Sequence, residues 1–190
     1  TDMGVNMAGY SIVDDEICCE ASRQEVVRRY FKTACMVRQG LAGKQELNKL
    51  ELLMRTLGVD VNIRRTVPAA LAVAEATGEP ATAIELPDGQ IVTGKTSSLL
   101  GASAAALLNA LKVMAGIPDE LKLISPSVIQ PIQHLKVDHM GNRNPRLHTD
   151  EVLIALAISA ATDENASIAM DQLSELKDCD AHSTVILSQV

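Results

Sequence analysis

The scarcity of aromatic side chains is the feature that most constrains how this chain folds. Its 190 residues include one Phe, two Tyr and no Trp, although 47% of the residues are hydrophobic. The core must therefore be built from Ala, Leu, Val, Ile and Met, which favours tightly packed helices. The same scarcity argues against functions that use aromatic surfaces, such as stacking on single-stranded nucleic acid or enclosing a quaternary ammonium group.

The charge balance argues against two further classes of partner. The chain has 24 acidic and 17 basic residues and a formal net charge of −7. This is the wrong sign for a protein held mainly by phosphate-backbone contacts, so we expect no nucleic-acid partner. The longest apolar stretch, residues 152–161, is far shorter than the roughly 20 residues that cross a bilayer, so we expect no membrane partner.

The cysteines indicate the compartment. Four are too few for the disulfide framework of a small secreted domain, and adjacent Cys18 and Cys19 pair only under strain. We therefore predict a cytoplasmic protein. The chain starts at Thr1 without an initiator Met, and an apolar segment lies close to its last residue. We accordingly expect it to be part of a longer protein.

Helical periodicity dominates the first part of the chain. Apolar residues recur at steps of three and four in residues 14–39 and 47–57, and Gly40 and Gly58 follow these segments. Together the two segments predict a helical hairpin. We assign residues 1–65 to a helical subdomain. A further helix is expected over residues 66–77, with Thr66 as its capping candidate.

The spacing of the apolar residues changes at Ala81 from a helical pattern to one typical of β-strands. Pro87-Asp88-Gly89 separates two β-branched segments, residues 81–86 and 90–93, and predicts a β-hairpin. We assign residues 66–190 to a layered α/β subdomain with a mixed sheet, so the fold class is α/β. After the hairpin we expect a helix that is capped by Ser97 or Ser98 and ends at Gly116, a strand at 121–124 and a helix at 127–140. Two further helices, capped by Thr149 and Asp163, and an interior strand at 182–188 complete the expected elements.

Four segments carry a resemblance to a known family. They read TDMGVNMAGY, AIELPDGQIVTGKTSSLLGASAAALLNALK, GNRNPRLHTDEVLIALAISAAT and CDAHSTVILS. They resemble the C-terminal part of a bacterial family catalogued as domain of unknown function eighteen-forty-six. The resemblance implies a longer cytoplasmic protein with an upstream domain, and a closing α/β part similar to the cytidine-deaminase-like topology. It carries no catalytic residue over to this chain.

Residues 89–96 match the phosphate-loop pattern G-x-x-x-x-G-K-[ST]. A phosphate loop is a bare loop between a strand and a helix, whereas these residues include three β-branched side chains directly after a turn. We therefore predict the second strand of the hairpin here. The residues that follow the strand, Lys95, Thr96, Ser97 and Ser98, lie where a helix start could bind a phosphate or carboxylate. Ordinary capping beside a solvated Lys95 is the alternative.

The histidines and the last cysteine suggest two other chemistries. Cys179 with His182, and His148 with Glu151, have spacings found in zinc sites, but the deaminase signature is missing and we predict no metal site. A Cys179 thiolate activated by His182 or His148 is the catalytic alternative, and an inert cysteine is the structural one.

Two pairs of basic side chains complete the candidates. His134 and His139 are five residues apart, so on an α-helix they should point to different faces. Arg143 and Arg146 lie in an Asn-rich loop, where they could meet a carboxylate or simply be solvated.

Two functions remain open. The first is binding of a phosphorylated or carboxylated small molecule as part of a larger enzyme. The alternative is a non-catalytic domain for assembly or interdomain contact. The upstream domain of the same protein is the expected partner, a homo-oligomer is expected, and no cofactor is predicted.

Overall fold

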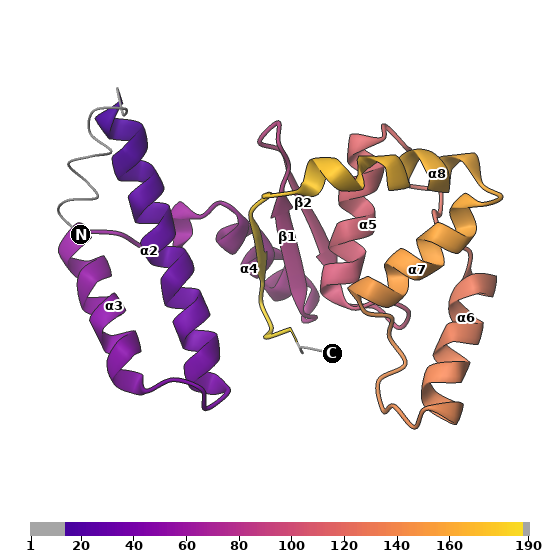
Figure 1. Ribbon diagram of the computed structural model, residues 1–190, viewed down its shortest axis with the longest axis horizontal. Helices are drawn as coiled ribbons and strands as arrows, with labels where there is room; N and C mark the ends of the chain where they lie inside the picture. The colour runs from indigo at the N-terminus through magenta and orange to yellow at the C-terminus, as the bar shows by residue number, and fades with distance from the viewer. Residues whose placement is uncertain (1–13, 188–190) are drawn as a thin grey trace. The chain divides into compact units, whose positions relative to one another are not determined.

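A computed structural model describes residues 14–187 of the chain (Figure 1). The chain divides into two compact units, residues 1–64 and residues 65–190. The first unit is helical in its described part, and the second combines helices with a small sheet. Each unit is described separately below.

The first unit contains the predicted helical hairpin. Its elements are α2 (Asp15–Arg38), α3 (Lys44–Leu57) and the short 3-10 helix η1 (Val61–Ile63). The Asp14 carboxylate caps α2 by accepting a hydrogen bond from the Ile17 amide at 3.0 Å. Gly58 ends α3 in the left-handed conformation, with φ of 61°. Val27, Met54 and Val59 are the buried residues of its hydrophobic cluster.

The sheet of the second unit is a three-stranded antiparallel sheet. The strands are β1 (Ala81–Glu85), β2 (Ile91–Lys95) and β3 (Ala181–Ser183), in the order β2-β1-β3. β1 and β2 form the predicted hairpin, in register from Ala81 opposite Lys95 to Glu85 opposite Ile91. Gly89 takes the positive φ of 82° that the turn requires. The hairpin excludes a phosphate loop at residues 89–96.

Three predictions about the sheet are wrong or not supported. The sheet is antiparallel and not mixed, and no cytidine-deaminase fold is shown. The closing strand is three residues long and lies at an edge, so the prediction of an interior strand at 182–188 is wrong. After Thr184, whose amide still bonds to the Ala81 carbonyl, Val185, Ile186 and Leu187 leave the sheet and are exposed. Ser188 lies outside the described residues.

Helices cover the two faces of the hairpin (Figure 1). Helix α4 (Thr66–Thr77) contacts all three strands, and α5 (Ala102–Met114) contacts β1 and β2. Val92 packs on Ala110 of α5, while Ala83, which alternates with the residues on this face, is fully buried on the other. A Cβ at Gly94 would overlap the backbone of Ala105 and Ala106, so the glycine permits the close approach of α5 to β2.

The remaining helices pack on the other side of α5. They are α6 (Pro126–His134), the π-helix η2 (Leu135–His139), α7 (Thr149–Ala160), α8 (Glu164–Asp171) and the 3-10 helix η3 (Gln172–Leu176). Leu111, Leu147 and Leu156 are fully buried in the shared core. Leu123 and Ile124 join that core without sheet pairing, so the strand predicted at 121–124 is wrong. The apolar run indicated burial, which a helical core satisfies equally well.

Three predicted helix caps are also wrong. The Ser97 hydroxyl accepts hydrogen bonds from the Leu99 and Leu100 amides in a local turn, and α5 begins only after Gly101. Thr66 is the first residue of α4, and its hydroxyl donates to the Asp180 carboxylate at 2.9 Å. Thr149 is likewise the first residue of α7, because His148 is the N-cap. Asp163 does cap α8, as predicted.

The π-helix changes the relation of two histidines. His134 and His139 come together, with ring centroids 5.6 Å apart, and the His134 ring pairs with the Asp138 carboxylate. The prediction that these rings point to different faces is therefore wrong. It assumed α-helical spacing, whereas a π-turn bonds residues five apart and so brings them to one face.

None of the helices within residues 14–187 has both the length and the apolar character needed to cross a membrane.

Replacing Gly94 with Ala should destabilise the second unit by roughly 1–3 kcal/mol, because the added methyl group meets α5 backbone that cannot move aside cheaply. Gly101→Ala is the matched control: its Cβ would lie 3.7 Å from the Leu147 carbonyl, an ordinary contact. The control substitution should lower the free energy of unfolding by less than about 1 kcal/mol. Urea unfolding followed by circular dichroism measures both changes, and equal losses would contradict this account of Gly94.

Candidate functional site

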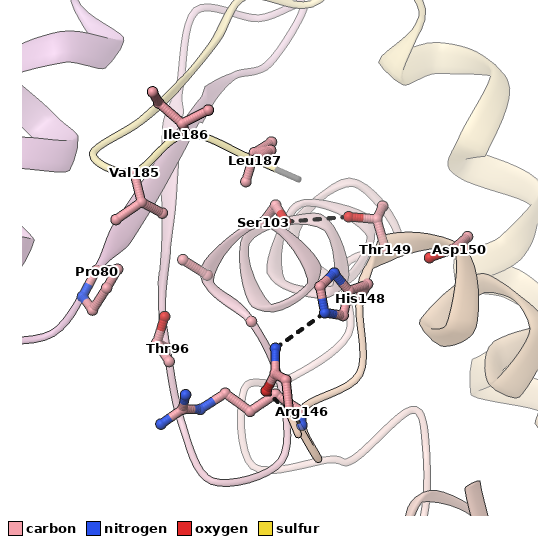
Figure 2. A pocket seen from close by; sticks show the side chains of 13 residues that line it. Pro80, Thr96, Ser103, Arg146, His148, Thr149, Asp150, Val185, Ile186 and Leu187 are labelled. Carbon is pink, nitrogen blue, oxygen red and sulfur yellow. Dashed lines mark hydrogen bonds between the residues drawn. The ribbon is translucent and has the colours of Figure 1, made fainter. Parts of the chain in front are cut away.

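A cavity of about 580 Å³ lies in the second unit, beside the starts of two helices (Figure 2). The first residues of α5 and of α7 line one side, together with the loop that precedes α7. Val185, Ile186 and Leu187, which follow β3, form an apolar wall opposite them. The cavity therefore has a polar side built from helix starts and an apolar side built from the closing segment.

A parallel backbone pairing holds the two helix starts together. Leu100 and Leu147 form a parallel bridge, in which the Gly101 amide donates to the Leu147 carbonyl at 3.1 Å and the Leu147 amide to the Leu99 carbonyl at 2.9 Å. Both segments then enter a helix within two residues. In the first turns of these helices, the hydroxyls of Ser103 and Thr149 lie 3.2 Å apart. The N-termini of α5 and α7 consequently reach the same cavity.

The two helix starts differ in how they are capped. The N-cap of α5 is Gly101, and no side chain bonds to the amides of its first turn. In α7 the Glu151 carboxylate accepts a hydrogen bond from the His148 amide at 2.7 Å, and Asp150 adds a second acidic side chain. The positive end of the α5 dipole is therefore uncompensated by its own sequence, whereas that of α7 is compensated.

A buried lysine fixes the loop that precedes α7. The Lys136 side chain is 4% exposed, and its ammonium group donates to the Glu151 carboxylate at 2.7 Å and to the Arg146 carbonyl at 2.8 Å. The pair neutralises Glu151 and secures all three elements that meet there: the π-helix, the loop and α7. A buried ammonium needs such partners, because its desolvation alone would cost several kcal/mol.

Arg146 and Asn144 present polar groups to the cavity. Arg146 Nε donates to the Ser97 carbonyl at 2.8 Å, and Figure 2 shows the side chain extending toward Thr96. Asn144 accepts from the Arg146 amide at 3.1 Å, and its side-chain nitrogen lies 3.1 Å from His148 Nε2. The loop therefore holds a guanidinium beside two helix starts, an arrangement suited to an oxyanion.

Three of the predicted candidates line this cavity, and the others do not. Thr96, Arg146 and His148 line it. Lys95 is exposed at the end of β2. Ser97 and Ser98 do not line the cavity, although the Ser97 carbonyl accepts a hydrogen bond from Arg146. His182 lies within β3, paired with Ala83, and Cys179 precedes that strand. The four-residue anion site at Lys95, Thr96, Ser97 and Ser98 thus stays a prediction, and the helix start it relied on lies at Gly101 instead.

The contacts of Cys179 do not favour a nucleophile. Its thiol lies 3.7 Å from the Glu175 carbonyl, and desolvation, followed by the nearby Asp178 carboxylate, raises its pKa. A raised thiol pKa lowers the thiolate fraction at neutral pH. Among residues 14–187, no three His, Cys, Asp or Glu side chains are grouped so as to hold a metal ion.

Sequence reasoning missed the start of α5 and the role of Glu151. Glycine and alanine at a helix start carry no side-chain signal, so Gly101 and Ala102 gave no sign of a site. His148 and Glu151 did carry a signal, because a polar residue followed three places on by Glu before an apolar run is typical of a helix N-terminus. The same spacing is also found in zinc sites, but here Glu151 satisfies a backbone amide.

The fold and the cavity define a mixed α/β protein with a helical N-terminal unit and a polar cavity at two helix starts. Comparison with family models identifies the family. The model for the C-terminal domain of the family of unknown function DUF1846 matches residues 62–190, and the model for the N-terminal domain of that family matches residues 1–58. The chain belongs to the DUF1846 family, which confirms the resemblance seen in the sequence.

Curated relatives carry the family name UPF0371. The chain is 55% identical over 190 residues to a UPF0371 protein of Corynebacterium urealyticum, 57% identical over 191 residues to one of Corynebacterium aurimucosum, and 55% identical over 188 residues to one of Streptococcus thermophilus. It is matched over 99–100% of its own length but spans only 38% of each relative. The relatives are therefore considerably longer proteins.

Lys136→Met should destabilise the second unit by about 1–3 kcal/mol, because it leaves the Glu151 carboxylate and the Arg146 carbonyl without their shared donor. Lys122→Met, at an exposed lysine of the same unit, should change stability by less than about 0.5 kcal/mol. Urea unfolding measures both variants. A Lys136 variant as stable as the control would show that the buried pair does not hold this loop.

Cys179 should react with iodoacetamide more slowly than exposed Cys19 at neutral pH, since burial and Asp178 raise its pKa. Its rate should keep rising with pH above the ordinary thiol range near about 8.5. Asp178→Asn should speed the reaction, and Asn also tolerates the positive φ of 64° at this position. Mass spectrometry of the alkylated peptides gives the rates. A fast reaction that His182→Ala slows would restore the nucleophile hypothesis.

Proposed function

We propose that the second unit binds a small molecule carrying a phosphate or carboxylate group, as part of the longer protein to which the relatives correspond. The observation that carries the proposal is the meeting of the α5 N-terminus and Arg146 in one cavity. Backbone amides at a helix start and a guanidinium are the two groups that proteins use most directly for oxyanions.

The cavity walls support a particular orientation of such a ligand. The acidic first turn of α7, with Asp150 lining the cavity, disfavours an anion on that side. The uncapped start of α5 and the Arg146 side chain favour it on the other. Val185, Ile186 and Leu187 would then contact the rest of the molecule, so the preferred ligand has an apolar or weakly polar body as well as its anionic group.

The second candidate function is a non-catalytic role in assembly or interdomain contact. Homo-oligomerisation would be part of that role and stays a proposal. Exposed apolar side chains on α7 favour it, because Ile154 and Ile158 are 61% and 58% exposed and lie one helical turn apart. A cytoplasmic location likewise stays a proposal.

Binding to the cavity can be tested with inorganic phosphate and with acetate as probes, by titration calorimetry at constant ionic strength. Arg146→Gln should weaken binding roughly tenfold or more, since a charge-assisted hydrogen bond contributes about 1.5–3 kcal/mol. Arg143→Gln is the matched control, because Arg143 lies in the same loop but does not line the cavity. Equal affinity in both variants, or no binding of either probe, would contradict the proposed function.

A further inference from the structure

The helical hairpin of the first unit buries few of its own apolar residues. In α2, a helix of 24 residues, Val27 alone among the side chains is buried, and in α3, a helix of 14 residues, Met54 alone is buried. Both belong to one small cluster with Val59. Tyr30 and Phe31 pack against it only partly buried, although they are the largest apolar side chains among the described residues of the unit. Within residues 14–64 the two helices have no third layer over them, and two helices alone cannot enclose a core.

One face of α3 is apolar and open. Leu50, Leu53 and Leu57 follow one another at steps of three and four, so they form a stripe along the helix, here termed the α3 leucine stripe. Leu50 is half-buried against the unit, while Leu53 and Leu57 are 41% and 44% exposed. Such a stripe on a globular helix normally faces a core.

A cluster of charged side chains lies on α2, the other helix of the hairpin. Glu25 on α2 accepts hydrogen bonds from Arg28 at 2.6 Å and from Arg29 at 2.9 Å, and these bonds lower the Glu25 pKa to about 2. All three side chains are accessible to solvent. The hairpin thus has a solvated ionic surface on α2 and, on α3, an apolar surface that the part of the chain described by the structure leaves exposed.

The family match indicates what the apolar face meets. The N-terminal domain model of the family matches residues 1–58, and that match ends at Gly58, the residue that ends α3. The chain spans only 38% of its relatives. The hairpin therefore belongs to a family domain distinct from the one matched at residues 62–190, and the relatives hold much more chain than this hairpin to complete it.

We infer that the α3 leucine stripe is an internal docking surface, packed in the longer protein against the part of the N-terminal DUF1846 domain that lies outside this chain. The occupant is thus a segment of the same polypeptide with a complementary apolar face. Docking would bury Leu53 and Leu57 and complete the core that Val27 and Met54 begin. The inference concerns the first unit, so it stands or falls independently of ligand binding by the second.

Hydrogen exchange provides the direct test. The chain would be placed in the full-length Corynebacterium urealyticum relative, in exchange for the 190 residues to which it aligns. Amides of α3 should exchange at least about tenfold more slowly in this chimaera than in the chain alone, whereas those of α5 should exchange equally in both. Unchanged exchange in α3 would overturn the inference.

A pair of variants locates the surface. Leu53→Glu combined with Leu57→Glu should abolish the extra protection of α3 in the chimaera, and should leave the helix content of the isolated chain unchanged because both side chains are already exposed there. Leu41→Glu, at a 71% exposed leucine between the two helices, is the matched control and should keep the protection.

Other occupants would give different results, each of which overturns the inference. Protection of α3 in the isolated chain that rises with protein concentration would indicate a second copy. Concentration-independent protection of α3 in the isolated chain, lost in the Leu53 and Leu57 variant, would indicate that another part of this chain covers the stripe.

Discussion

The short parallel pairing of Leu100 with Leu147 is the contact on which the second unit depends. Two backbone hydrogen bonds join segments far apart in sequence, and Leu147 is fully buried beneath them. Because each segment becomes a helix immediately afterwards, the pairing fixes where α5 and α7 begin. It also brings the Arg146 side chain within hydrogen-bonding distance of the Ser97 carbonyl. The geometry of the cavity follows from this one pairing.

Small side chains make the rest of that unit possible. A chain with one Phe, two Tyr and no Trp cannot fill wide gaps between layers, so its layers must approach closely. Gly94 on β2 and the alanines of α5 allow this approach, and Ala104, Ala106 and Ala110 are fully buried. An enlarged side chain at this contact would force the helix from the sheet, which is why the composition constrains the architecture.

Local sequence signals predicted most helices and the β-hairpin correctly. They did not predict the features that depend on contacts between residues far apart in the sequence. The Pro87-Asp88-Gly89 turn, the helix over residues 66–77 and the helix start capped by Asp163 follow from neighbouring residues, and the structure bears them out. Three features depend on tertiary packing, so no local pattern indicates them. They are the Leu100–Leu147 bridge, the edge position of β3 and the π-turn before His139. Of the candidate site, Thr96, Arg146 and His148 were within reach of sequence reasoning, whereas the backbone amides of the first turn of α5, which follow Gly101, were not.

The sign of the local charge in the cavity is opposite to that of the whole chain. A helix N-terminus carries about half a positive charge, and α5 has no acidic residue in its first turn to offset it. Arg146 adds a full positive charge, whereas Asp150 subtracts one beside the start of α7, and Lys136 neutralises Glu151. The positive side of the cavity is therefore the α5 side. A formal net charge of −7 repels anions at long range, but that repulsion is screened beyond about 8–10 Å at physiological salt. Short-range donors in the cavity are screened far less, so they decide whether an anion is held there.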